Sequence, residues 1–64
     1  MKEYKGYYLP TKRHRKMREY IFAEISDIEA AKYFTKLCKD SGWELVNVFN
    51  DKREALFTNG VLNV

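Results

Sequence analysis

A helix that runs directly into a strand is the feature that most constrains the fold of this chain. Ser26 and Glu29 have the S-x-x-E spacing of a capping box, in which the serine hydroxyl accepts a hydrogen bond from the backbone N–H three residues on and the glutamate reaches back to the serine N–H. Asp27 places negative charge at the positive end of the helix dipole. Gly42 stands where a left-handed residue ends a helix, directly before Trp43 and a strand-like stretch. The sequence therefore predicts one capped helix followed at once by a strand.

The predicted helix and the strand after it each have a side to bury. Small or apolar residues recur at helical spacing and cluster on one helix face, namely Ala30, Ala31, Phe34, Leu37 and Cys38. In residues 43–49, alternation places Trp43, Leu45, Asn47 and Phe49 on one strand face and Glu44, Val46 and Val48 on the other. Because aromatic side chains bury the most area, we expect Phe34 and Trp43 to be the two largest core residues, with Trp43 closing the helix onto the sheet.

The residues before the helix predict two strands. Residues 4–9 are aromatic and strand-like, with Gly6 marking a bend or bulge, and Pro10 ends the strand because proline cannot donate to a ladder. Residues 19–25 fit two patterns. Alternation predicts a strand, whereas a helix would be favoured by a stripe at Met17, Tyr20, Ile21, Ile25 and Ile28. The capping box at Ser26 favours the strand, since it indicates that a new helix begins there.

The residues after residue 49 predict a turn followed by a returning strand. Residues 50–53 read Asn-Asp-Lys-Arg, which is typical of a turn, and residues 54–58 predict the returning strand. Asn59 and Gly60 both tolerate a positive φ, which is the signal of a type I′ hairpin turn. Residues 61–64 then either pair back as a short strand or fray.

The predicted element order is ββαββ in a single α+β domain of 64 residues. One helix covers one face of an antiparallel sheet, because both elements have apolar sides to bury. The connection through the helix should be a right-handed crossover. Two strand orders are open, 1-2-4-3 and 1-2-3-4, and helix-to-sheet packing favours the first.

A helix, a Gly-Trp-Glu-Leu-Val motif, a loop and an Ala-Leu-Phe strand follow one another in the C-terminal half of the chain. The residues concerned are Gly42, Trp43, Glu44, Leu45 and Val46, followed by Ala55, Leu56 and Phe57. With these residues the chain resembles a family of small bacterial and phage domains of unknown function. The resemblance implies a βαββ core and no particular chemistry. The first strand and a basic segment ahead of that core set this chain apart from the family.

Positive charge is concentrated in one short stretch. The chain has a net charge of +3, and five of its twelve lysines and arginines lie in residues 12–18, at Lys12, Arg13, Arg15, Lys16 and Arg18, with His14 among them and no acid. The other seven cations stand against nine aspartates and glutamates, a net charge of −2. The basic segment, residues 12–18, therefore gives the surface a local positive field.

Three interpretations of the basic segment compete. It is a solvated loop that aids solubility, a phosphate-binding segment, or a contact for an acidic protein surface. Tyrosines near it could stack on unpaired bases, namely Tyr4, Tyr7, Tyr8 and Tyr20. The chain has no zinc-finger spacing, no Gly-flanked aromatic RNA motif and no clear helix-turn-helix. The candidate binding residues are the five cations together with Tyr8 and Tyr20.

The sequence disfavours catalysis and metal binding. It has no Ser/His/Asp or Cys/His set, no phosphate-binding glycine loop and no paired carboxylates in an apolar setting. Cys38 reads as a small buried hydrophobe, and His14 with one distant cysteine does not make a metal site. No secretory signal or membrane-spanning stretch is evident, so we expect a cytoplasmic protein without a cofactor, a membrane contact or a small-molecule substrate.

These patterns predict a small non-enzymatic binding protein. The first hypothesis is a regulatory or inhibitory protein of the phage or bacterial type, which engages an acidic protein surface through its basic loop and its sheet. The alternative is a nucleic-acid-binding module that contacts phosphates through residues 12–18.

Overall fold

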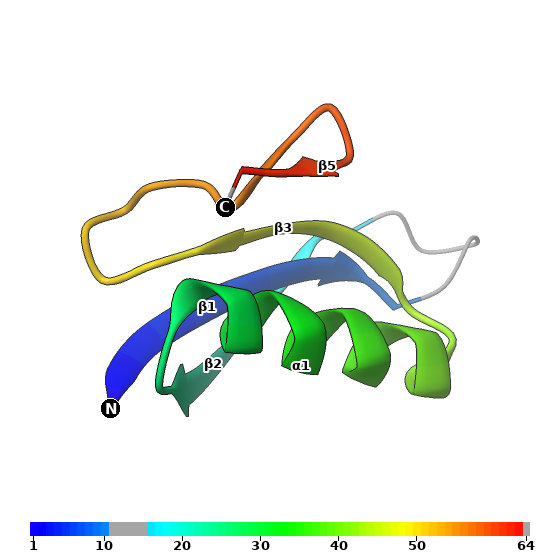
Figure 1. The fold of residues 1–64 in the computed structure, drawn as a ribbon. Coiled ribbons are helices and arrows are strands. Elements are labelled where there is room, and N and C mark those ends of the chain that lie inside the picture. The colour runs from blue at the N-terminus through cyan, green and yellow to red at the C-terminus, as the bar shows by residue number, and fades with distance from the viewer. Residues whose placement is uncertain (11–15, 64) are drawn as a thin grey trace.

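The computed structural model describes residues 1–10 and 16–63. Its elements follow in the order β1 (Lys2–Leu9), β2 (Arg18–Glu24), α1 (Asp27–Ser41), β3 (Glu44–Phe49), β4 (Phe57–Thr58) and β5 (Val61–Leu62). The first three strands form an antiparallel sheet, and α1 lies across one of its faces (Figure 1). The predicted α+β class, with one helix on an antiparallel sheet, is confirmed, and the residues predicted as a strand at 19–25 form β2 as far as Glu24.

The strand order is β2-β1-β3, with β1 in the centre. Both predicted orders placed the first strand at an edge, and in this respect they were wrong. β2 and β3 are each antiparallel to β1, so they run parallel to each other, and α1 connects them across β1. The central place suits β1 because three of its residues lie buried under the helix, namely Tyr4, Gly6 and Tyr8.

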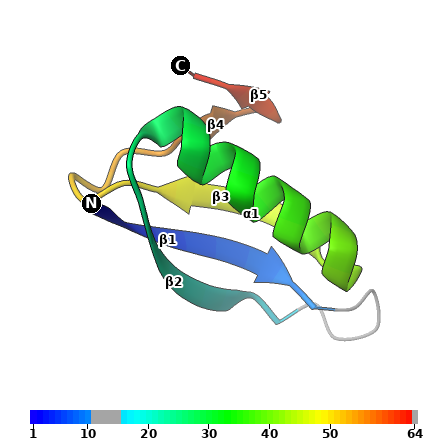
Figure 2. The same ribbon diagram turned by 60° about the horizontal axis from the view of Figure 1, so that its bottom comes forward.

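The predicted returning strand over residues 54–58 does not enter the main sheet. Phe49 and Ala55 form an isolated bridge. Beyond this bridge, hydrogen bonds from the Asn47 side chain take the place of backbone pairing between β3 and the returning chain. The Asn47 Oδ1 accepts from the Phe57 N–H at 3.2 Å, and its Nδ2 donates to the Phe57 carbonyl at 3.1 Å. β4 instead pairs with β5 through Asn59 and Gly60, whose φ values of 52° and 79° agree with the predicted hairpin turn. This hairpin lies beyond β3, near α1 (Figure 2).

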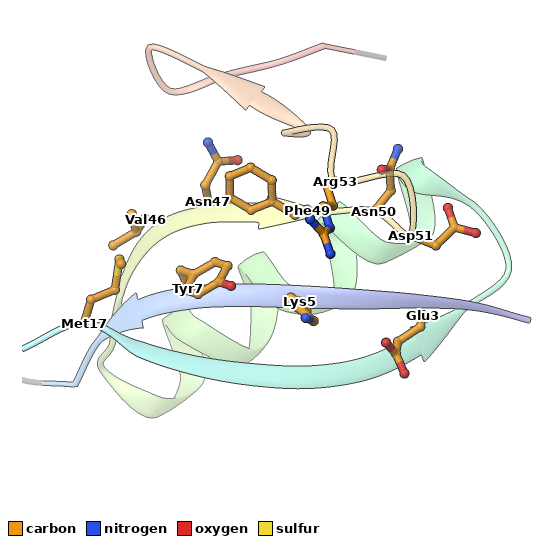
Figure 3. A pocket seen from close by; sticks show the side chains of 10 residues that line it. All are labelled: Glu3, Lys5, Tyr7, Met17, Val46, Asn47, Phe49, Asn50, Asp51 and Arg53. Atoms are coloured by element: carbon orange, nitrogen blue, oxygen red, sulfur yellow. The ribbon is translucent and has the colours of Figure 1, made fainter.

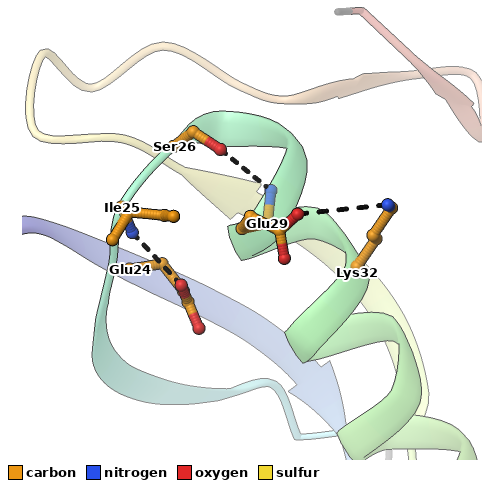
Figure 4. A network of polar contacts seen from close by, with 5 residues as sticks. All are labelled: Glu24, Ile25, Ser26, Glu29 and Lys32. Atoms are coloured by element: carbon orange, nitrogen blue, oxygen red, sulfur yellow. Dashed lines mark hydrogen bonds and ion pairs between the residues drawn. The ribbon is translucent and has the colours of Figure 1, made fainter.

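The helix begins and ends at the predicted residues. The Ser26 Oγ accepts from the Glu29 N–H at 3.3 Å, and Gly42 adopts a left-handed φ of 73°. The Glu29 carboxylate is directed toward Lys32, with 4.0 Å between Oε1 and Nζ (Figure 4). The serine half of the capping box is therefore formed, while the Glu29 side chain extends along the helix.

The core lies between α1 and the sheet. Its largest fully buried side chains are Tyr4, Phe34 and Val48. The prediction for Phe34 is confirmed, whereas Trp43 is half-buried and stacks on Tyr8, with ring centroids 3.9 Å apart. Tyr4 takes the place that was expected for Trp43, because the central position of β1 brings it directly beneath the helix.

Gly6 allows α1 to pack closely against β1. A Cβ atom on Gly6 would overlap the Phe34 ring, so the helix can approach β1 this closely only over a glycine. The predicted bend or bulge lies elsewhere, since the irregularity of this strand pair falls between Tyr7 and Tyr8.

A bulge in β3 changes which of its side chains face the helix. Tyr7 lies opposite Asn47 and Tyr8 opposite Leu45, so Val46 is the extra residue. Leu45 and Val48 therefore both face the helical side, whereas strict alternation had placed them on opposite faces. The change of phase leaves Val46 exposed, and it lies with Tyr7 and Phe49 on the other side of the sheet.

Candidate functional site

No described element covers the face of the sheet that is turned away from α1, which we call the open face. Figure 3 views this open face, with the helix behind the sheet. Alternation in β1 buries Tyr4, Gly6 and Tyr8, so the residues between them project to the open face. The open face therefore combines the aromatic ring of Tyr7 with the charge of Lys5.

A groove of about 820 Å³ follows β1 and β3 on the open face. It also reaches the residues next to both strands, and it is lined by Glu3, Lys5, Tyr7, Met17, Val46, Asn47, Phe49, Asn50, Asp51 and Arg53 (Figure 3). Tyr7, Val46 and Phe49 supply an apolar floor, and Met17, which belongs to the basic segment, also lines the groove. This open-face groove is the candidate functional site.

Two aromatic rings fix the floor of the open-face groove. Tyr7 and Phe49 meet edge to face, with ring centroids 5.6 Å apart and an interplanar angle of 84°. The Tyr7 hydroxyl donates to Glu19 Oε2 at 2.7 Å, which ties β1 to β2. This hydrogen bond to Glu19 raises the pKa of Tyr7, because it stabilises the protonated hydroxyl. The geometry gives a partner a preformed aromatic surface.

The rim beside β3 is formed by a turn that Asn50 organises. The Asn50 Oδ1 accepts from the Lys52 and Glu54 N–H groups, each at 2.9 Å, and the Arg53 N–H donates to the Asn50 carbonyl at 3.0 Å. Arg53 adopts a positive φ of 63° within this turn. The turn predicted for residues 50–53 is confirmed, and it brings Arg53 to the groove.

The charges around the open-face groove have both signs. Lys5 and Arg53 are cationic, whereas Glu3 and Asp51 are anionic, and all four line the groove. Such a mixture favours an apolar contact with charged flanks over the binding of a single anion. Among residues 1–10 and 16–63, no group of three or more His, Cys, Asp or Glu side chains is placed to hold a metal ion.

The structure separates the residues that the sequence proposed for binding. Lys12, Arg13 and Arg15 lie outside the described residues, whereas Lys16 and Arg18 are exposed. Tyr8 is only 9% exposed and stacks on Trp43, so it belongs to the core. Tyr20 is half-buried on the helical side of β2, with its hydroxyl 3.2 Å from that of Tyr33.

Sequence reasoning missed most of the open-face groove. Tyr7 was one of the four tyrosines considered. The alternation of β1, which turns Tyr7 to the face opposite Tyr4 and Tyr8, could have distinguished it from them. Val46 and Phe49 could not be assigned to one surface, because the bulge that brings them together is invisible to simple alternation. Lys5 and Arg53 had no distinguishing signal.

Comparisons with protein families, with curated proteins and with solved structures found no match to this chain. The resemblance of residues 37–59 to a family of small domains stays a prediction. In the part of the chain that the structure describes, no helix is long and apolar enough to cross a membrane.

Proposed function

We propose that this protein is a small non-enzymatic binding protein, of the regulatory or inhibitory kind, that engages a protein partner through its open-face groove and its basic segment. The observation that carries the proposal is the contiguous surface of Tyr7, Val46 and Phe49, which no described element covers. Exposed aromatic and apolar side chains that are surrounded by charged residues are typical of protein contacts.

The position of Met17 links the two parts of the proposed site. Met17 lines the open-face groove, and its neighbours Lys16 and Arg18 are exposed. A partner with an apolar anchor in the groove would therefore place its adjoining surface near Lys16 and Arg18. Charge complementarity favours an acidic surface there, which would raise the association rate and make binding sensitive to salt.

Nucleic acid is the second candidate, and the basic segment is the observation that favours it. The open face argues against it in two respects. Glu3 and Asp51 would repel phosphates near the groove, and the ring of Phe49 is already in edge contact with Tyr7. A protein side chain packs against the Tyr7–Phe49 pair without separating the two rings.

We also place the protein in the cytoplasm. Burial raises the pKa of the Cys38 thiol to about 11, so the chain's one cysteine is an unreactive core side chain. A buried thiol of this kind suits a reducing compartment.

The test compares two valine substitutions that differ in location. Val46 on the open face and Val61 in the β4–β5 hairpin are 41% and 67% exposed, so Val46→Glu and Val61→Glu each add one charge at an exposed valine. Proteins captured from the source cell by the wild type are identified, purified and titrated against both variants. We expect Val46→Glu to weaken binding by about tenfold or more, as for a contact at the centre of an interface, and Val61→Glu to leave it unchanged.

Two results would overturn the proposal. Equal affinities of the two variants for the purified partner, with unchanged melting, would remove the open-face groove from the binding site. Steeply salt-dependent binding of DNA or RNA that is unaffected by Val46→Glu would establish the nucleic-acid alternative.

A further inference from the structure

The outer edge of β2 is a free pairing surface. β2 lies at one end of the sheet, and no strand among the described residues pairs with its outer side. The opposite edge, at β3, is partly closed by the Phe49–Ala55 bridge and by the hydrogen bond from Leu56 N–H to the Val48 carbonyl at 2.8 Å. β2 contains no proline, and its register with β1 runs over seven residues without a shift. β2 is therefore protected neither by a proline nor by a bulge, which are two of the devices that keep edge strands from pairing.

β2 and its flanking residues also carry exposed apolar side chains. Met17, Ile21 and Ile25 are 54%, 56% and 66% exposed, and they are four residues apart along the chain. Ile21 lies in β2, Met17 directly precedes the strand, and Ile25 directly follows it. This apolar row, Met17, Ile21 and Ile25, therefore places large exposed side chains at the middle and at both ends of the free edge.

We infer that a second copy of this chain pairs with β2 in antiparallel orientation, about a two-fold axis at Ile21. The two three-stranded sheets would join into one continuous sheet. In this register Ile21 lies opposite Ile21 of the second copy, and Met17 lies opposite Ile25 of the second copy. The pairing therefore brings each exposed apolar side chain of the row against another one.

The apolar row and charge complementarity together select this register. A symmetric antiparallel pair must place residues of the same face opposite each other, so the axis falls at a residue such as Tyr20, Ile21 or Phe22. With the axis at Ile21, Arg18 lies opposite Glu24 of the second copy, and the symmetry forms this ion pair twice. With the axis at Tyr20, Lys16 would lie opposite Glu24 of the second copy, but Ile21 would lie opposite the charged Glu19. With the axis at Phe22, Arg18 would lie opposite Ser26, and Ile21 opposite Ala23.

The side chains of the proposed β2–β2 pair that face α1 are also complementary. Tyr20 and Phe22 face α1 and remain half-buried in one copy. The Ile21 axis places Tyr20 opposite Phe22 of the second copy, which is a favourable cross-strand aromatic pair. A domain this small buries a limited core, so association through β2 would also add to its stability. The contact shares Met17 and Arg18 with the surface proposed for the partner, but its backbone pairing lies along the outer edge of β2, whereas the groove follows β1 and β3.

The first test uses charge reversal on purified protein, with no other partner present. Sedimentation equilibrium should show a dimer, and Arg18→Glu or Glu24→Arg should each raise its dissociation constant by about tenfold, because like charges then lie opposite each other twice. The double variant Arg18→Glu/Glu24→Arg restores both pairs and should recover the wild-type constant. A protein that stays monomeric at millimolar concentration, or a double variant no better than the single ones, would overturn the inference.

The second test reads the register directly by cysteine cross-linking. A cysteine at the axis lies opposite itself within disulfide reach, so Ile21→Cys should form a covalent dimer on oxidation by copper phenanthroline. Ala23→Cys is the matched control, because it is exposed on the same strand face but lies opposite Glu19 of the second copy. Equal cross-linking of the two variants, or none for Ile21→Cys, would contradict the Ile21 axis.

Discussion

Replacing Gly6 by alanine tests the packing of the helix on the sheet, because two effects of the substitution have opposite signs. Gly6 does not have a positive φ, so alanine suits its backbone. Removing a glycine from such a position ordinarily stabilises a protein by about 0.4–1 kcal/mol through the unfolded chain. A new Cβ, however, would lie 2.7 Å from Phe34 Cδ1 and closer still to Cε1 and Cζ.

The Phe34 ring cannot move aside easily. It is fully buried and lies parallel to Phe22, with ring centroids 5.7 Å apart and an interplanar angle of 5°. Tyr20 and Tyr8 contact it at centroid distances of 6.0 and 6.1 Å. Relief of the overlap therefore requires α1 to shift away from β1, and overpacking of this kind costs about 1–3 kcal/mol. We expect a net loss of stability.

Thermal unfolding followed by circular dichroism measures the effect. Each kcal/mol lowers the midpoint by about 4–8 °C in a domain of this size, so Gly6→Ala should lower it measurably at a fixed protein concentration. In a Phe34→Leu background the ring atoms are gone, and Gly6→Ala should become neutral or stabilising. A midpoint that rises when Gly6→Ala is made in the wild type would refute the reasoning.

Three further predictions concern local contacts. Ser26→Ala should lower the free energy of unfolding by about 0.5–2 kcal/mol in chemical denaturation, whereas Ser26→Asp should keep most of the cap. Asn47→Ala leaves the Phe57 backbone groups without their side-chain partner, at a cost of about 1–3 kcal/mol, and should speed hydrogen exchange in the β4–β5 hairpin; unchanged exchange there would contradict the anchoring role of Asn47. Burial and a 2.7 Å hydrogen bond to Asp27 raise the pKa of Tyr4 from 10.0 to about 12, so the unfolded chain loses this proton first and stability should fall as the pH rises from 10 to 12. Tyr4→Phe should flatten the profile of stability against pH between 10 and 12. An unaltered profile would show that Tyr4 is not the group whose titration lowers the stability.

Local signals in the sequence predicted local structure well. The Ser26 cap, the left-handed Gly42 and the Asn59–Gly60 turn depend on residues that are close in the chain, and the structure has all three. The capping signal also decided correctly between strand and helix for the residues before Ser26, since β2 ends at Glu24.

Contacts between distant residues were beyond sequence reasoning. β1 takes the centre of the sheet because the connection through α1 leaves a place between β2 and β3, which no local pattern records. The Asn47 side chain ends the pairing of β3 with the returning chain through contacts to a residue ten positions on. The extra residue at Val46 changes the phase of β3, and with it the membership of the open-face groove. The charge of the basic segment was visible in the sequence, whereas the open-face groove could be recognised only from the fold.

Site-specific photo-cross-linking tests most directly whether the open-face groove is the working surface. A benzoylphenylalanine in place of Val46 reports on the groove, and the same group in place of Val61 is the matched control, since both valines are exposed on strands. In extract of the source cell, the account predicts an adduct with one protein species at position 46, distinct in mass from a dimer of this chain. Excess wild-type protein should suppress this adduct, and the Val46→Glu protein should not. An adduct at position 61 with none at position 46, or adducts that contain only nucleic acid, would contradict the account.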